Sequence, residues 1–364
     1  SSTLEKILPT FEAYVQKSLS EWQAPGVAIA IVKDGQIVYE KGFGVREVDQ
    51  AEAVDPYTVF PIASLTKNFL VTLICQLVEE GVLDWDKPVK TYLPDFHLSN
   101  PDITNEFTIR DLVSHRSGLK AFSGDSFWNL GFRAAEIQEC LGQLPFEKTF
   151  RQDYGYQNHL FGIASQLVEK VTGQSIPTLF QNRLFKPIGL NHSSAGPINQ
   201  SQKGLWERIK DWFKKPKHNI ATPHHVIGAK TTALPISPLM YTFNGSTGVN
   251  SCAHDMGLWM IFHLNNGQIN GTQVVSEKQL AQMRTPHVQA TNLRPDDIQF
   301  PAIRISRVHY GMGWFLGYYG EGSTKVSFLN HMGGFGGVRS LMTLIPEKNL
   351  GIVILSNFGS MRVS

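Results

Sequence analysis

Apolar residues in the middle of the chain recur at helical spacing. One run spans residues 69–78 and stops at Gly81, and another spans residues 160–171 and stops at Gly173. Positions three and four apart share one face of a helix, and glycine often follows its last turn, so both runs predict helices. We expect a third, amphipathic helix over residues 4–22.

Both ends of the chain carry the shorter apolar runs that are typical of strands. Residues 26–32 and 36–39 flank Asp34-Gly35, a dipeptide that favours a two-residue hairpin turn. Strand-like segments near the other end alternate with glycine-rich turns, and they lie at 314–315, 326–328, 341–345 and 352–355. Strands at both ends with helices between them predict that the two ends of the chain meet in one antiparallel sheet.

The expected fold class is therefore α/β, an α+β sandwich in which helices flank an antiparallel sheet built from both chain ends. We assign residues 1–82 and 234–364 to this sandwich lobe and residues 83–233 to an inserted, mostly helical lobe. Pockets commonly form where two such units meet, so we expect the functional site in the crevice between the lobes.

Composition narrows the class of protein. With 364 residues, 42% of them hydrophobic, and no apolar run of membrane-spanning length, the chain is expected to be a soluble globular protein. A net charge of +2 gives no support to nucleic-acid binding. Cys75, Cys140 and Cys252 are isolated and odd in number, which favours free thiols over disulfides. None of the twelve histidines has a metal-ligand spacing, so neither a metal site nor a cofactor is expected.

The segment Ser64-Leu65-Thr66-Lys67 opens the helix predicted over residues 69–78. A lysine three positions after a serine on a helix lies on the same face, within reach of the hydroxyl proton, which is the arrangement of an activated nucleophile. The alternative is a serine that only caps the helix start.

A second copy of the pattern, Ser117-Gly118-Leu119-Lys120, lies in a turn-like stretch with no strand before it. Ser64 is therefore the better candidate nucleophile. We expect the neighbouring His115 and Arg116 to be structural and to satisfy turn carbonyls.

Two further motifs supply candidate chemistry. Tyr156-Gln157-Asn158 precedes the helix predicted over residues 160–171, and a phenol becomes a usable base only beside a cation, which Lys67 would be. A half-buried tyrosine with a satisfied hydroxyl is the alternative. His331-Met332-Gly333 continues a strand-like segment, where glycine marks close backbone approach, although a glycine-rich hairpin without chemistry would look the same.

Together the three motifs form the set found in penicillin-recognising acyl-transfer enzymes. The chain resembles the family of serine β-lactamases, penicillin-binding proteins and related esterases, in the branch that includes class C β-lactamases and D-amino-acid peptidases. The resemblance covers nearly the whole chain and implies the β-lactamase/transpeptidase-like fold. It also implies a location in the bacterial periplasm or secretion, although no signal-peptide pattern opens the sequence.

The resemblance implies a role for each motif. Ser64 would attack a carbonyl, Lys67 and Tyr156 would move its proton as a coupled pair, and Asn158 would orient Lys67 and the substrate amide. On the third motif, Gly333 and Gly334 would line the substrate site, with the Gly334 and Ser64 amides as the oxyanion hole.

The first residue of the third motif departs from the class C pattern, since His331 stands where those lactamases carry lysine. The expected activity is therefore that of an esterase or D-amino-acid-type peptidase with weak β-lactam reactivity, acting on a small ester, peptide or β-lactam without a cofactor. A true β-lactamase is the alternative within the family. A non-catalytic penicillin-binding-like or membrane-associated scaffold is the alternative from another class.

A stripe of apolar residues at helical spacing covers residues 205–213 and is interleaved with lysine and arginine. Such a segment suits contact with an anionic membrane surface, but it could equally cover the cleft or pack on the helical lobe. The sequence leaves the natural substrate and the oligomeric state open.

Overall fold

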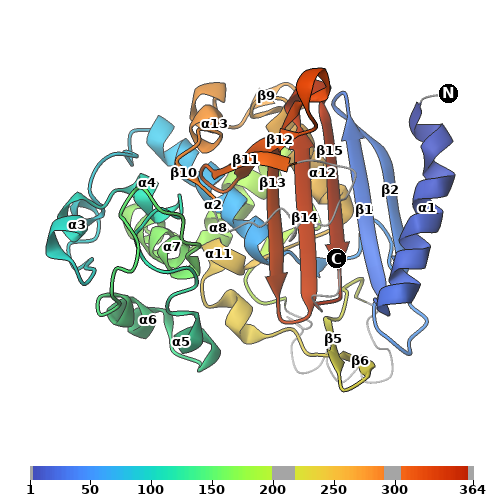
Figure 1. Cartoon of the computed structure of the whole chain (residues 1–364), viewed down its shortest axis with the longest axis horizontal. Coiled ribbons are helices and arrows are strands. Elements are labelled where there is room, and N and C mark those ends of the chain that lie inside the picture. The colour runs from blue at the N-terminus through green and yellow to red at the C-terminus, as the bar shows by residue number, and fades with distance from the viewer. Residues whose placement is uncertain (1–2, 199–217, 291–304, 360–364) are drawn as a thin grey trace.

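Eight antiparallel strands from both ends of the chain form the central sheet of the protein, in the order β10-β11-β12-β13-β14-β15-β1-β2 (Figure 1). The computed structural model describes residues 3–198, 218–290 and 305–359. The strands are β1 Gly26–Lys33, β2 Gln36–Gly44, β10 Val288–Gln289, β11 Ile305–Tyr310, β12 Phe315–Tyr319, β13 Val326–Phe335, β14 Val338–Ile345 and β15 Leu350–Ser356. The predicted meeting of the chain ends is confirmed, because Val27 of β1 pairs with Ser356 of β15.

The hairpin between β1 and β2 follows from its turn residues. Asp34 and Gly35 both have positive φ angles, 52° and 78°, as a two-residue turn that matches the strand twist requires. On the outer face of this end of the sheet lies α1 Thr3–Trp22, which packs through Val15 against the strands (Figure 1). The helix predicted over residues 4–22 is therefore confirmed.

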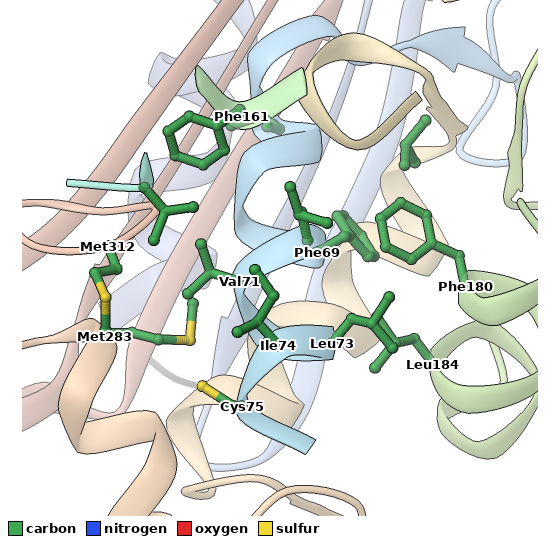
Figure 2. Packing of buried hydrophobic residues seen from close by; sticks show 14 of the residues in the cluster. Phe69, Val71, Leu73, Ile74, Cys75, Phe161, Phe180, Leu184, Met283 and Met312 are labelled. Carbon is green, nitrogen blue, oxygen red and sulfur yellow. The ribbon is translucent and has the colours of Figure 1, made fainter. Parts of the chain in front are cut away.

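On the opposite face α12 Ala253–Leu264 packs against β1, β2 and β15, and α2 Thr66–Glu79 packs against α13 Glu277–Met283. Helix α2 is surrounded by apolar side chains, as Figure 2 shows, with Phe69 directed toward Phe180 and Val71 toward Met283. Seven of its apolar side chains are buried, and because exposing them to water would be costly, their packing fixes the helix in the molecule.

The middle of the chain is mostly helical, as predicted. Its helices are α3 Pro101–Glu106, α4 Ile109–Leu112, α5 Asp125–Asn129, α6 Ala134–Leu141, α7 Asn158–Thr172, α8 Ile176–Phe180 and α9 Lys186–Ile188. Helix α7 corresponds to the run predicted over residues 160–171, and it ends at Gly173 in the left-handed conformation. The exact lobe boundaries at residues 83 and 233 stay a prediction.

Several short strands and one short α-helix lie between these elements. They are β3 Phe60–Pro61, β4 Ser194–Ala195, β5 His224–Ile227, β6 Lys230–Ala233, α11 Asn244–Thr247, β7 Val249–Ser251, β8 Gln268–Ile269 and β9 Thr272–Gln273. All three cysteines are free thiols, and Cys75 and Cys252 are buried. Within the described ranges no helix is long and apolar enough to cross a membrane. The stripe over residues 205–213 lies outside those ranges, so its membrane contact stays a prediction.

Candidate active site

Ser64 lies in a short 3₁₀ helix, Ala63–Leu65, that leads directly into α2. The preceding residue, Ala63, has a φ of 46°, a left-handed conformation that costs a non-glycine residue about 1 kcal/mol or more and is common at functional sites. Lys67 occupies the first turn of α2, and its Nζ lies 3.0 Å from Ser64 Oγ. The two groups are thus placed together as their spacing predicts.

The Lys67 side chain is fully buried and makes three polar contacts. Its Nζ lies 3.0 Å from Ser64 Oγ, 2.8 Å from Asn158 Oδ1 and 3.3 Å from the carbonyl oxygen of Ser246. Burial lowers the pKa of Lys67 to about 7, although the nearby Asp125 carboxylate acts to raise it. Two of the three contact atoms are carbonyl oxygens, which only accept hydrogen bonds. A neutral amine can therefore donate to both and turn its lone pair toward the Ser64 hydroxyl.

Tyr156 lies just before α7 and faces the same hydroxyl. Its ring centroid is 5.0 Å from Lys67 Nζ, and it packs against the rings of His115 and Phe122. Burial raises the pKa of Tyr156, while a hydrogen bond with Ser64 acts to lower it. The phenol therefore keeps its proton at neutral pH and is better suited to relaying a proton than to abstracting one.

His331 lies on β13 and is neutral. Its Nδ1 lies 2.8 Å from the carbonyl oxygen of Met332 and so carries the proton, which leaves Nε2 to accept from the Tyr310 hydroxyl at 3.1 Å. Burial lowers the pKa of His331 to about 3. The third motif therefore presents a neutral imidazole where a lysine would present a cation.

The glycine after Met332 allows β13 to pass against the nucleophile. A Cβ atom on Gly333 would clash with the carbonyl oxygen of Ile62 and would lie 3.0 Å from the Ser64 amide nitrogen. Strand β12 pairs with β13 only as far as Asn330, so on that side residues 331–335 have no strand partner within the described chain. An extended substrate could form backbone hydrogen bonds with this unpaired edge of β13.

The second copy of the serine and lysine pattern does not form a pair. Ser117 is buried, and its hydroxyl accepts a hydrogen bond from the Leu119 amide at 3.2 Å. Lys120 is exposed and points toward Glu147, with 3.9 Å between the charged atoms. The glycine between the two residues leaves them in a turn rather than on one helical face.

The expectation that His115 and Arg116 satisfy turn carbonyls is wrong. Arg116 lies 2.8 Å from the carboxylate of Asp111, which is completely buried and needs a cationic partner. His115 accepts a hydrogen bond from the Gln157 amide at 3.0 Å and packs against Tyr156 with 4.1 Å between ring centroids. The pair thus supports the wall of the site.

Sequence reasoning missed three side chains that border the site, namely His115, Asp125 and Tyr310. Asp125 accepts a hydrogen bond from Asn158 Nδ2 at 2.9 Å, and Tyr310 reaches His331 as described above. Neither residue belongs to a recognisable motif, so no local signal could have identified it. His115 lies next to the turn at Ser117, but its contact with Tyr156 depends on the tertiary fold.

One cluster outside this site has the residue types of a metal centre. The ligand atoms of His192, Cys252 and Asp255 lie within 4.8 Å of one another. The Asp255 carboxylate accepts from the His192 amide and the Ser193 hydroxyl, both at 2.8 Å, and the Cys252 sulfur accepts from the Asp255 amide at 3.4 Å. These bonds join the start of α12 to residues 192–193, which precede β4, and explain the cluster structurally.

Comparison with known proteins places these features in context. The sequence matches the Beta-lactamase family over residues 11–362. It is 33% identical over 192 residues to the "Unguisins hydrolase ungD" of Aspergillus violaceofuscus, across 50% of this chain and 34% of that protein. It is 24% identical over 355 residues to "Protein flp" of Staphylococcus aureus, across 96% of this chain and 62% of that protein. The chain thus spans between about a third and three fifths of the length of these curated relatives.

Two solved structures share the fold. A structure of the octameric penicillin-binding protein homologue from Pyrococcus abyssi has a TM-score of 0.77 and 22% identity, and covers 96% of this chain and 73% of its own. A crystal structure of SurE has a TM-score of 0.70 and 19% identity, and covers 95% of this chain and 71% of its own. The predicted fold class, an antiparallel sheet flanked by helices with a mostly helical insertion, is confirmed.

Proposed function

Because the chain belongs to the Beta-lactamase family, we propose that it is a serine hydrolase that acts through an acyl-enzyme on Ser64. The observation that carries the proposal is the 3.0 Å contact between Ser64 Oγ and Lys67 Nζ, in a site where burial leaves the amine partly neutral at pH 7. A hydroxyl becomes a useful nucleophile when a base of suitable pKa lies within hydrogen-bond reach.

In the acylation step, the Lys67 lone pair takes the proton from Ser64 while Oγ forms a bond to the substrate carbonyl carbon. The carbonyl π electrons move to its oxygen, which would be held by the Ser64 and Gly334 amides. The close approach of Gly333 to the Ser64 backbone supports this placement, because it brings β13 against the nucleophile.

When the carbonyl re-forms, the bond to the alcohol or amine leaving group breaks. The leaving group takes the proton that Lys67 holds, relayed through the Tyr156 hydroxyl. A water then attacks the ester on Ser64, gives its proton to the same pair, and releases the acid as the Ser64 hydroxyl is restored. None of these reaction steps requires a cofactor.

Short esters and D-amino-acid peptides are the substrate classes we favour over β-lactams. The neutral imidazole of His331 is a weak anchor for a β-lactam's carboxylate, since a hydrogen bond to a charged group is stronger than one between neutral groups. The open edge of β13 suits an extended acyl chain. The fungal relative is named as a hydrolase, which supports hydrolysis as the reaction class.

One assay distinguishes this proposal from its two alternatives. These are a true β-lactamase, within the family, and a non-catalytic scaffold. We would compare kcat/KM for a short-chain nitrophenyl ester, a D-amino-acid nitroanilide and nitrocefin, using the wild-type chain and Ser64→Ala. Ester or peptide turnover that exceeds nitrocefin turnover and disappears in Ser64→Ala supports the proposal. Faster nitrocefin turnover favours the β-lactamase, and no Ser64-dependent turnover of any substrate favours the scaffold.

A further inference from the structure

Asp125, the first residue of α5, holds the Asn158 amide from the side opposite Lys67. Its Oδ2 accepts a hydrogen bond from Asn158 Nδ2 at 2.9 Å, and Asn158 Oδ1 in turn accepts from Lys67 Nζ at 2.8 Å. Two hydrogen bonds therefore link the carboxylate to the candidate base. The pair is brought together by the fold, since Asp125 and Asn158 are 33 residues apart.

On its other side the carboxylate lies beside a buried imidazole. Asp125 Oδ1 lies 3.1 Å from Nε2 of His159, whose side chain has no solvent exposure. Aromatic rings surround that imidazole, with the centroid of Phe243 at 5.4 Å and that of Trp128 at 5.8 Å. Within the described chain, neither Asp125 Oδ1 nor either ring nitrogen of His159 has a partner with hydrogen-bond geometry. The imidazole is thus close to the carboxylate, and the hydrogen bond that Asp125 does make at this site is the one with Asn158.

We propose that Asp125 is a positioning residue, which sets the direction of the Asn158 amide and thereby turns the Lys67 lone pair toward Ser64. This inference rests on the proposed function. Asp125 lies outside the three motifs, and the inference gives it a role in orienting Lys67, the proposed base.

The direction of the amide follows from hydrogen-bond chemistry. An asparagine side chain can present either its oxygen or its NH₂ group to a neighbour, whereas a carboxylate only accepts. Asp125 therefore selects the NH₂ group and leaves Asn158 Oδ1 for Lys67. With Oδ1 and the Ser246 carbonyl as acceptors, both N–H bonds of a neutral amine are used. The lone pair that remains faces Ser64.

The negative charge of Asp125 has a second effect on the same amine. It acts to raise the pKa of Lys67, against the larger effect of burial. His115 and His331 are the imidazoles whose positive charge would act on Lys67. Burial lowers the pKa values of both, so they stay neutral. Burial also keeps Tyr156 protonated. Asp125 is thus the carboxylate that tunes Lys67 among the residues described.

The test measures the rate of acylation by a fluorophosphonate between pH 5 and pH 9, with the adduct mapped to Ser64. In Asp125→Asn the amide oxygen can still accept from Asn158, but the charge is gone. In a plot of acylation rate against pH, the rate rises as Lys67 loses its proton. We expect the midpoint of this rise to fall by about one pH unit in Asp125→Asn, because an anion no longer favours protonated Lys67. In Asp125→Ala we expect the same shift and a roughly tenfold lower plateau, because Asn158 loses its orientation.

Two further variants make the comparison specific. Asp125→Glu restores the charge and should return the midpoint toward the wild-type value. Asp102→Asn, which removes an exposed carboxylate from the first turn of α3, should leave both the midpoint and the plateau unchanged. Thermal unfolding of each variant verifies that it is folded.

The outcomes separate this inference from the proposed function. If no adduct forms on Ser64 of the wild-type chain, the proposed function fails, and this inference fails with it. A Ser64 adduct whose midpoint is the same in wild type and in folded Asp125→Asn overturns the inference alone. A loss confined to KM for cationic ester substrates also overturns it, because Asp125 would then bind substrate rather than position the base.

Discussion

Lys67 Nζ lies 3.0 Å from Ser64 Oγ at a position where the lysine side chain is sealed from solvent. Desolvation disfavours the ammonium form, and it outweighs the attraction of the Asp125 carboxylate. A group that is ordinarily a permanent cation therefore changes its charge near neutral pH. The proposed mechanism depends on this change.

Acylation should rise with pH through the pKa of Lys67, which is about 7. The sign follows from the chemistry, since only the neutral amine can accept the Ser64 proton, and neutral amine accumulates above that pKa. We expect kcat/KM for a nitrophenyl ester to increase about tenfold per pH unit well below pH 7 and to level off above about pH 8. A profile that is flat from pH 5 to pH 8 would contradict this role for Lys67.

Lys67→Ala and Tyr156→Phe should each slow acylation by roughly a hundredfold or more, the usual scale for a lost acid or base. The two losses should not multiply, because both residues act on one proton. Single-turnover rates of the two variants and the double variant test this coupling. A double variant whose loss equals the product of the single losses would show that the residues act independently.

His331→Lys should shift preference toward β-lactams. The native imidazole is neutral, with a pKa of about 3, whereas a lysine would offer a cation to the substrate carboxylate. We expect the ratio of kcat/KM for nitrocefin to that for a short ester to rise about tenfold, the value of one charge-assisted hydrogen bond. His331→Gln is the matched neutral control, and an equal rise in that variant would refute the electrostatic explanation.

Asp111→Ala should destabilise the fold more than any loss of a surface charge. The buried Asp111 carboxylate lies 2.8 Å from Arg116 and 2.8 Å from Arg151, so its removal leaves two guanidinium groups without their partner. We expect a loss of about 3–5 kcal/mol in the free energy of unfolding, measured by urea denaturation. Asp102→Ala, an exposed control in the same region, should change it by about 0.5 kcal/mol or less. Equal effects in the two variants would contradict this account of Asp111.

Local patterns were sufficient to predict the elements that carry the motifs. The helical run after Lys67 and the turn at Asp34 and Gly35 depend on neighbouring residues, and each was found where its sequence indicates. The contacts around the base are of another kind. Asp125 reaches Asn158 across 33 positions, and Lys67 reaches the Ser246 carbonyl across 179. Every residue has a backbone carbonyl, so the sequence cannot indicate which one accepts a hydrogen bond from Lys67.

Tyr310 shows the same limit. Its hydroxyl meets His331 because β11 and β13 lie in one sheet with β12 between them, an order that the topology determines. Nothing in the residues around Tyr310 distinguishes it from the other tyrosines of the core. The sequence thus predicts helices, turns and motifs that depend on neighbouring residues. It does not predict contacts that form only when distant segments pack together.

The most direct test of the account is intact mass spectrometry of the chain after exposure to a fluorophosphonate, followed by peptide mapping. The account predicts one adduct, on Ser64, that is absent from Ser64→Ala and retained in Ser117→Ala. An adduct on Ser117, or one that persists in Ser64→Ala, would contradict the assignment of the nucleophile.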